Sequence, residues 1–217
     1  MELYTIGHSN HSIETLIGLL KQHDIAALAD VRSHPYSRYL PHFNQASLKS
    51  SLQTAGIQYV FLGQELGARP SDPECYIEGK ALYEKIAATE LFAQGIQRLL
   101  KGAERYKIAL MCAEKDPITC HRAILVCPHL RSLNLPIQHI LKDGSLESHE
   151  QLESRLLKLH GLENFEASKP LQLSLFSLEE PSNIPLKQRS REELLQEAYQ
   201  KQGEQIAYVE KSQSHNE

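Results

Sequence analysis

The sequence predicts a three-layer, Rossmann-like α/β domain with a mostly parallel sheet, followed by a flexible C-terminal arm. Short apolar runs alternate with longer segments in which apolar residues recur every three or four positions. This alternation favours right-handed crossovers and helices on both faces of the sheet. At 217 residues, the chain has room for one domain and an appendage. We assign the domain to residues 1–162 and the arm to residues 163–217.

Five compact apolar runs, each bounded by polar residues, Gly or Pro, predict the strands. They are LYTIG (3–7), IAALADV (25–31), IQYVFL (57–62), KIALMC (107–112) and IQHIL (137–141). Several of the helical segments begin with Ser, Asn or Thr and end with Gly. The predicted helices cover 12–23, 44–56, a long stretch around 80–105, 121–133 and 149–161. Pro128 predicts a kink or break in the fourth.

The periodic pattern ends after Gly161. Residues 163–190 contain three prolines together with serines and acidic residues, which is typical of a flexible segment. The stretch 189–202 is predicted to form one amphipathic helix.

Charge is distributed unevenly along the chain. Residues 1–162 carry 17 Lys and Arg and 17 Asp and Glu, whereas residues 163–217 carry 6 basic and 10 acidic residues. The formal net charge of -4 therefore comes from the arm. Proteins that hold nucleic acid through their own charge normally have a basic surface, so such a role here needs local patches or a recruiting partner.

Neither a membrane segment nor a signal peptide is predicted. No apolar run approaches the roughly 20 residues of a membrane helix, and MELYTIGHSN lacks a basic start and a long apolar stretch. The four cysteines show no disulfide-framework spacing. We therefore expect a cytoplasmic protein with reduced thiols.

Polar side chains follow three of the predicted strands at their carboxyl ends, where open α/β sheets bind ligands. Each polar segment alone can be explained as a helix cap, but the convergence of all three favours a site. The residues are His8, Ser9, Asp30, Arg32, Cys112 and Glu114.

The stretch LMCAEKDPITCHRAIL (110–125) raises three interpretations: a metal site, a thiol active site, or an anion pocket at a helix start. Zinc sites usually contain pairs such as C-x2-C, whereas seven residues separate Cys112 from Cys120. No metal ligand is therefore predicted, and any cofactor is left unknown. The C-x-E part matches half of the nucleoside deaminase motif, but the P-C-x-x-C partner is absent. Neither cysteine has Arg six positions later, which excludes the phosphatase C-x5-R loop.

The anion pocket is the interpretation we favour. Thr119 is predicted to cap a helix containing residues 120–122, which places backbone N–H groups and partial positive charge there. Arg122 and Arg32 would then hold a phosphate or carboxylate. Cys120, at the same helix start, is predicted to be a thiolate of low pKa.

A structural alternative is left open, in which Cys120 packs under the sheet and Arg122 pairs with Glu114 or Asp116. In the catalytic interpretation, carboxylates and histidines serve as acid or base and a cysteine serves as nucleophile. The candidate catalytic residues are His8, Asp30, Cys112, Glu114, Cys120 and His121, and the candidate substrate-binding residues are Ser9, Arg32, Tyr36, Arg38 and Arg122.

Four blocks of sequence carry a family resemblance. TIGHS (5–9), DVRSHPYSRYLPHF (30–43), LG (62–63) and MCAEKDPITCHR (111–122) resemble, in the same order, the signature blocks of the domain of unknown function 488 family. The resemblance spans about residues 2–145, and HILKDGSLESH (139–149) is similar to a further block. Because the family name records no established activity, the resemblance supports the candidate residues without assigning their roles.

Aromatic and cationic side chains alternate in SHPYSRYLPHF (33–43). Tyr36 and Arg38 could stack on a base and hold its phosphates. Alternatively, the rings pack against the sheet in a proline-braced loop, and we expect at least one of them to do so.

The peptide LQLSLFS (171–177) is the most partner-specific feature. Gln172, Leu173, Leu175 and Phe176 are similar to the pentapeptide by which bacterial repair and replication proteins dock on the DNA sliding clamp. The apolar side chains would fill a pocket and Gln172 would bind at its rim. The alternating leucines also fit an edge strand added to the sheet.

We therefore expect an enzyme-like protein that acts on nucleic acid or nucleotides in DNA repair or modification and is recruited by the sliding clamp. A tether of this kind would raise the effective concentration at DNA of a domain that has no net charge. Two alternatives stay open: a thiol- or metal-dependent enzyme of small-molecule metabolism, and a non-catalytic adaptor.

Overall fold

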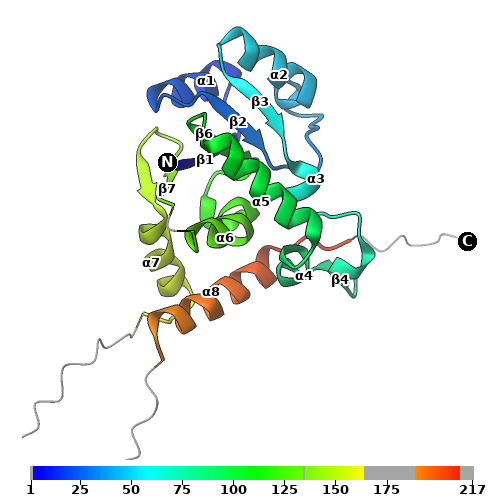
Figure 1. The fold of residues 1–217 in the computed structure, drawn as a ribbon, viewed down its shortest axis with the longest axis vertical. Coiled ribbons are helices and arrows are strands. Elements are labelled where there is room, and N and C mark those ends of the chain that lie inside the picture. Colours follow the sequence, from blue (N-terminus) through cyan, green and yellow to red (C-terminus); the bar gives the residue numbers. More distant parts are fainter. Residues whose placement is uncertain (1, 134, 164–188, 211–217) are drawn as a thin grey trace, which may run out of the picture.

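The computed structural model describes residues 2–133, 135–163 and 189–210. Its centre is a six-stranded sheet with the order β3-β2-β6-β1-β7-β8 (Figure 1). Neighbouring strands are parallel except for β8, which pairs antiparallel with β7. All five predicted strands are present, so the predicted mostly parallel sheet is confirmed. The bounds are β1 Leu3–Gly7, β2 Ala27–Asp30, β3 Gln58–Phe61, β6 Ile108–Cys112, β7 Ile137–Ile140 and β8 Leu146–Ser148.

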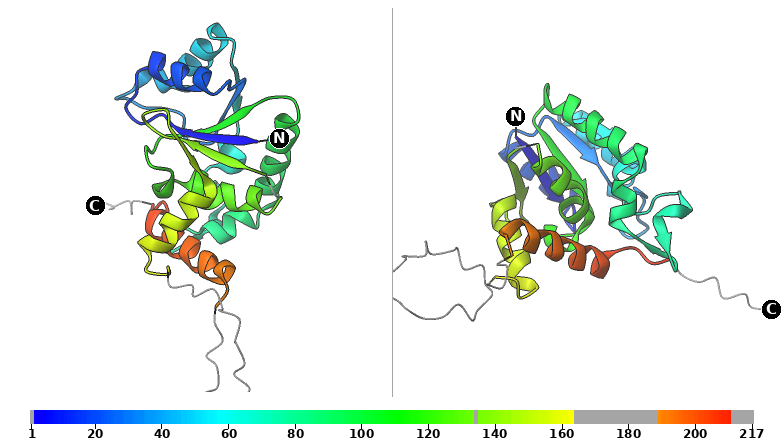
Figure 2. Two further views of the ribbon diagram at one scale, coloured as in Figure 1. Left: turned by 90° about the vertical axis from the view of Figure 1, so that its left-hand side faces the viewer. Right: turned by 60° about the horizontal axis from the view of Figure 1, so that its bottom comes forward.

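Helices cover both faces of the sheet (Figure 2). α1 (Ile13–Gln22) and α2 (Gln45–Thr54) pack on one face, and α5 (Glu90–Ala103) and α6 (Cys127–Arg131) pack on the other. Because side chains alternate along a strand, β6 contributes Leu110 and Cys112 to one core and Met111 to the other. Side chains at the carboxyl edge of the sheet therefore fall into two groups, one on each face.

The stretch around 80–105 is not the single helix that its apolar spacing predicts. It contains β5 (Lys80–Ala81), α4 (Tyr83–Ala87) and α5, and β5 pairs with β4 (Tyr76–Ile77) in a small hairpin. The break occurs at Thr89, whose side chain accepts a hydrogen bond from the Phe92 N–H and so begins α5. The remaining helices are α3 (Gly63–Leu66), α7 (His149–Leu159) and α8 (Arg191–Ile206), with short 3₁₀ turns at Pro41–Phe43, Pro73–Cys75 and Pro117–Thr119.

The connection from β6 to α6 corrects the predicted Thr119 cap. The Thr119 hydroxyl donates to the Asp116 carbonyl, and the Asp116 side chain caps the Pro117–Thr119 turn instead. Cys120 has extended backbone, and its carbonyl accepts the N–H groups of Ala123 and Ile124. The helical run begins at His121, as the predicted range 121–133 has it, but the capping position is Cys120 and not the predicted Thr119.

The predicted break at Pro128 takes the form of a π-helical turn over Arg122–Val126, which leads directly into α6. Within this turn the Cys127 N–H donates to the Arg122 carbonyl, five residues back. Proline has no N–H to continue the α-helical ladder, so a wider turn before Pro128 is physically reasonable.

The helix predicted in the arm is present as α8, and it packs on the main domain. Leu194, Leu195 and Ala198 are buried against Leu156 and Leu157 of α7. The described part of the predicted arm is therefore docked, and Figure 1 shows α8 running beneath α6 toward α4. The clamp-like peptide at 171–177 lies outside the described residues. In the described ranges, no helix has the combined length and apolar character to cross a membrane.

Candidate functional site

The carboxyl ends of β2, β6 and β1 lie side by side, as predicted from the polar residues that follow them. Gly7 is in register with Cys112, and Asp30 with Met111. After β1 the backbone stays close to the β6 loop, because the Ser9 N–H donates to the Ala113 carbonyl at 2.9 Å. Ser9 itself has a φ of 45°, in the left-handed region that costs energy for a residue other than glycine.

The candidate residues after β1 and β2 form one buried group on the α2 side of the sheet. Arg32 donates from Nε and Nη2 to the two oxygens of Asp30 at 2.8 and 2.6 Å. Tyr59 donates to the same carboxylate at 2.9 Å. His8 donates from Nδ1 to the Ser9 carbonyl, which leaves Nε2 to accept from Arg32 at 3.3 Å. Burial, followed by the nearby Arg32 charge, lowers the pKa of His8 to about 4.

This pairing limits what Arg32 and Asp30 can do. Asp30 is fully buried and Arg32 is 7% exposed, so each is the other's main partner. The Nε and Nη2 atoms of Arg32 are already bound to Asp30 and to the Phe43 carbonyl. The predicted contact of Arg32 with a phosphate stays a prediction.

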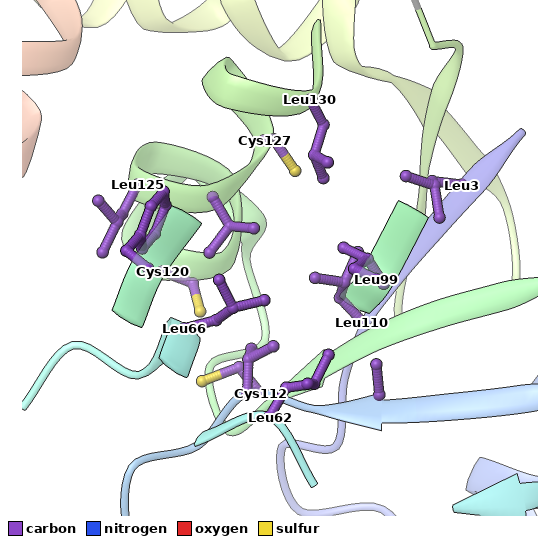
Figure 3. Packing of buried hydrophobic residues seen from close by; sticks show 14 of the residues in the cluster. Leu3, Leu62, Leu66, Leu99, Leu110, Cys112, Cys120, Leu125, Cys127 and Leu130 are labelled. Carbon is purple, nitrogen blue, oxygen red and sulfur yellow. The ribbon is translucent and has the colours of Figure 1, made fainter. Parts of the chain in front are cut away.

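A second group lies on the α6 side, and we call it the Cys/His cluster. It consists of Cys112, Glu114, Cys120 and His121, whose side-chain donor atoms all lie within 4.8 Å of one another. Both thiols donate to the same Glu114 Oε2 at 2.9 Å. The His121 Nδ1 lies 3.6 Å from the Cys112 sulfur and 4.0 Å from the Cys120 sulfur. Figure 3 shows the two cysteines among the leucines of the core under α6.

The tautomer of His121 follows from its other nitrogen. Nε2 lies 3.0 Å from the Val31 carbonyl, which can only accept, so Nε2 carries the proton. In the neutral ring, Nδ1 then presents a lone pair to the two sulfurs. A ring that donates to a backbone carbonyl on one side and offers a lone pair on the other is the usual arrangement of a metal-binding histidine.

Arg122 lies fully buried beside the Cys/His cluster and is held by neutral partners. Its Nη1 donates to the Glu114 carbonyl at 2.8 Å, and its Nε donates to the Thr5 hydroxyl at 3.3 Å. Its Nη2 has no hydrogen-bond partner in the described part of the chain. A buried guanidinium with neutral partners is costly unless negative charge lies close by.

The cluster supplies that negative charge through its thiols. Burial raises the pKa of Cys112, and the neighbouring Cys120 raises it further. Burial also opposes ionisation of Cys120, but the hydrogen bond with Cys112 and the Arg122 charge hold the pKa of Cys120 well below its usual value. Burial, followed by the charge of Cys120, raises the pKa of Glu114. Of the two thiols, Cys120 is therefore the one whose pKa is lowered.

The aromatic loop after β2 is divided between core and solvent. Phe43 is fully buried and its ring packs 4.2 Å from His8, so at least one ring packs as expected. Tyr36 and Tyr39 are 73% and 83% exposed. Arg38 lies over the Tyr39 ring at 5.3 Å from its centre.

Sequence reasoning missed several residues that contact the two groups. Tyr59 binds Asp30 and Thr5 binds Arg122, yet in the sequence both look like ordinary strand residues. Tyr83 was also missed. Its side chain packs against the core that contains Cys112 and Cys120. Burial raises the pKa of its hydroxyl, and the charges of Cys120 and Cys112 raise it further.

Tyr83 also lines a hollow of about 940 Å³ between α4, the π-helical turn, α6 and α8. The wall combines apolar and polar side chains, among them Ile124, Arg131 and Tyr199. The hollow therefore lies next to the core that contains the two cysteines of the cluster, on the face opposite to α1 and α2.

The fold and the cluster define an α/β protein with a buried Cys/His centre at the carboxyl edge of its sheet. The family model described as domain of unknown function DUF488 matches residues 12–127, more than half of the chain. The chain belongs to this family. The matched range includes three of the four resembling blocks, and TIGHS (5–9) lies just before it. No curated protein and no solved structure matches the chain.

Proposed function

We propose that this protein is a metal-dependent enzyme whose Cys/His cluster binds a divalent ion of the zinc class. The observation that supports this proposal is the set of donor atoms: two thiol sulfurs, one imidazole nitrogen and one carboxylate oxygen within 4.8 Å of one another. Thiolates and imidazole are preferred ligands of zinc and related soft or borderline ions, whereas magnesium and calcium prefer oxygen alone.

The spacing of the donors is close to that of a tetrahedral site. With bonds of about 2.0–2.3 Å to a central zinc ion, neighbouring ligand atoms stand about 3.5 Å apart. The distances from the His121 Nδ1 to the two sulfurs, 3.6 and 4.0 Å, agree with this geometry. The distances from Glu114 Oε2 to the sulfurs, 2.9 Å each, are shorter because thiol protons bridge them. Glu114 would move outward when an ion replaces those protons.

Charge balance supports the same conclusion. Two thiolates and one carboxylate carry three negative charges, and a divalent ion together with Arg122 carries three positive charges. The buried guanidinium is therefore compensated when the ion is bound. The second interaction of His121, with the Val31 carbonyl, holds its Nδ1 toward the site.

Glu114 is the ligand that substrate or water would replace at the ion. Among the four donor residues Glu114 is the exposed one, whereas Cys112, Cys120 and His121 are buried, with 3%, 1% and 7% exposure. Catalytic zinc sites usually keep three firm protein ligands and one exchangeable position. We assign Glu114 to that position, where its carboxylate can give way to substrate or water and act as an acid or base.

Metal content of purified variants tests this proposal. Reduced wild-type protein grown with zinc should retain about one ion per chain, and Cys112→Ser or Cys120→Ser should weaken zinc binding by roughly 10- to 1000-fold, because each removes a thiolate ligand. Elemental analysis and competition with a chromophoric chelator measure both quantities. Cys75→Ser and Cys127→Ser are matched controls, since these cysteines are equally buried but lie outside the cluster.

Zinc uptake and thiol alkylation of the wild-type protein separate this proposal from metal-free thiol catalysis. A reduced, folded wild-type protein that takes up no zinc, together with rapid alkylation of Cys120, would instead favour the nucleophile that the sequence predicts. The cytoplasmic location belongs to the same proposal, because both a thiolate ligand and a free nucleophile need a reducing compartment.

The peptide at 171–177 supports a second proposal, which concerns recruitment. We propose that Leu173, Leu175 and Phe176 dock on a DNA sliding clamp and bring the catalytic domain to nucleic acid. The even charge balance of residues 1–162 supports this, since tethering would replace a basic surface.

A pull-down with purified sliding clamp tests the recruitment proposal. The intact protein should capture the clamp, and the double variant Leu175→Ala/Phe176→Ala should lose capture because the apolar anchors are removed. Equal capture by both proteins, or capture by neither, would contradict it. Leu171→Ala, just outside the pentapeptide, is the matched control.

A further inference from the structure

A buried series of hydrogen bonds runs from Arg122 to the C-terminal helix, and we call it the buried path. The Thr5 hydroxyl, which accepts from Arg122, lies 2.8 Å from the His139 Nδ1. The other nitrogen of His139 lies 3.0 Å from the His149 Nδ1. The path connects five elements, the π-helical turn, β1, β7, α7 and α8, and its members are Arg122, Thr5, His139, His149, Tyr199 and Glu153.

The far end of the path is a carboxylate. The His149 Nε2 lies 2.9 Å from the Tyr199 hydroxyl, which in turn lies 3.2 Å from Glu153 Oε1. Arg131 donates to the same oxygen at 2.9 Å, and Arg191 reaches Oε2 at 3.4 Å. Both oxygens of Glu153 therefore act as acceptors.

The two ends favour one direction for the hydrogen bonds between them. Arginine can only donate, and an ionised carboxylate can only accept. Burial raises the pKa of Glu153, but the charges of Arg131 and Arg191 oppose this shift and favour the carboxylate. If Thr5 accepts from Arg122 and donates to His139, then His139 must donate from Nε2 to the His149 Nδ1. His149 then donates from Nε2 to Tyr199, whose hydroxyl donates to Glu153.

The opposite direction is disfavoured at both ends. It would require Tyr199 to donate to His149, which would leave two oxygens facing each other at 3.2 Å without a proton between Tyr199 and Glu153. It would also leave the Thr5 hydroxyl proton without His139 as its acceptor. Thr5 and His139 are fully buried and His149 is 5% exposed, so water cannot readily repair either loss.

Both rings are neutral near pH 7, which makes the tautomer a defined property. Burial, followed by the charge of His149, lowers the pKa of His139. Burial, followed by the charge of Arg131, lowers the pKa of His149 to about 4. Neither ring can therefore donate from both nitrogens at neutral pH.

We infer that His139, His149 and Tyr199 are positioning residues that hold Arg122, and through it the loop carrying Glu114, by a hydrogen-bond path of one fixed direction. Arg122 binds Thr5 through Nε and the Glu114 carbonyl through Nη1, so the path and the cluster meet at one side chain. α8 thus contributes to the site although Tyr199 touches none of the cluster residues. The inference needs no bound metal ion, so failure of the metal proposal would leave it standing.

Long-range ¹H–¹⁵N correlation spectra of the histidine rings test the inference, because they distinguish the protonated from the unprotonated nitrogen. In wild-type protein at pH 7, both His139 and His149 should be protonated at Nε2 alone. Tyr199→Phe should remove this single state, since the acceptor of the His149 Nε2–H is lost. Tyr76→Phe should leave both rings unchanged, because Tyr76 binds the Pro70 carbonyl outside the path.

Two results would overturn the inference. One is wild-type protein with either ring protonated at Nδ1 or in a mixture of tautomers. The other is a folded Tyr199→Phe protein with both rings as in the wild type. If Tyr199→Phe does not fold, Thr5→Val tests the opposite end of the path. In this variant, His139 should lose its preference for protonation at Nε2, and the slowly exchanging Arg122 Nε–H signal should be lost. Persistence of both would contradict the path.

Discussion

At the scale of single residues, the buried charge of Arg122 determines which groups must lie near it. A fully buried guanidinium held by a carbonyl and a hydroxyl needs negative charge nearby, and the sulfurs and carboxylate of the cluster provide it. The sequence predicts that Arg122, together with Arg32, holds a phosphate or carboxylate at a helix start, with an ion pair to Glu114 or Asp116 as the alternative. The burial of Arg122 arises from the strand β1 packing against it, which no local pattern reveals.

Gly7 makes this close packing possible. A Cβ at Gly7 would overlap the Glu114 carbonyl oxygen and lie 3.2 Å from the Arg122 Nη2. The lack of a side chain therefore lets the loop after β6 pass directly over the end of β1.

Gly7→Ala should consequently destabilise the protein by about 1–3 kcal/mol, because the Glu114 backbone must move to make room. Urea unfolding measures the effect. Gly18→Ala, in the middle of α1 with nothing within 4 Å of the new methyl group, is the control and should be neutral or stabilising by up to about 1 kcal/mol. Similar behaviour of the two variants would contradict the packing described for Gly7.

At the scale of elements, the strands were predictable and the β6–α6 connection was not. β1, β2 and β6 are buried on both faces and appear in the sequence as continuous apolar runs. β7 and the more exposed edge strand β3 also lie in compact apolar runs, so five of the six sheet strands could be placed. β8 was missed because it is short and its exposed residues carry no strong pattern. Its pairing with β7 depends on a tertiary contact.

The site depends on the least regular of these elements. Thr119 has the residue type of an N-cap, but the competing Asp116 cap moved the helix start to His121. The π-helical turn that follows places His121 and Arg122 on the same side as Cys120. The sequence predicted the residues of the cluster as candidates for a site. It did not predict that they form one set of metal ligands, because they come from a strand end, a loop and a helix start rather than from a closely spaced pair.

At the scale of the whole molecule, buried neutral histidines connect the site to the C-terminal helix. His139 and His149 lie between β1 and α8, and His8 lies at the other face of the sheet. Each has a lowered pKa in the folded protein, mainly because of burial. These residues are therefore expected to bind protons more readily once the protein unfolds.

This difference predicts acid sensitivity in a defined range. Below about pH 6.5 the unfolded chain takes up protons that folded His8 and His149 accept only near pH 4. The free energy of unfolding should then fall as the pH is lowered from 6.5 toward 4, by up to about 1.4 kcal/mol per pH unit for each histidine.

Urea unfolding across this pH range measures the slope. His149→Gln should reduce the slope by about one proton, whatever its effect on stability at pH 7. His34→Gln is the matched control, because His34 lies on the loop after β2 rather than in the buried path. An unfolding free energy that stays level between pH 6.5 and 5, or a slope unchanged in His149→Gln, would contradict the burial of these rings as neutral groups.

The central claim is that the Cys/His cluster is a metal centre, and cobalt spectroscopy of the wild-type protein tests it most directly. Titration of the reduced protein with Co²⁺ should produce the visible absorption of tetrahedral cobalt and a sulfur-to-cobalt charge-transfer band, saturating at about one ion per chain. Both signals should disappear when zinc is added. A folded, reduced protein in which cobalt keeps the spectrum of the free aqueous ion would contradict the claim.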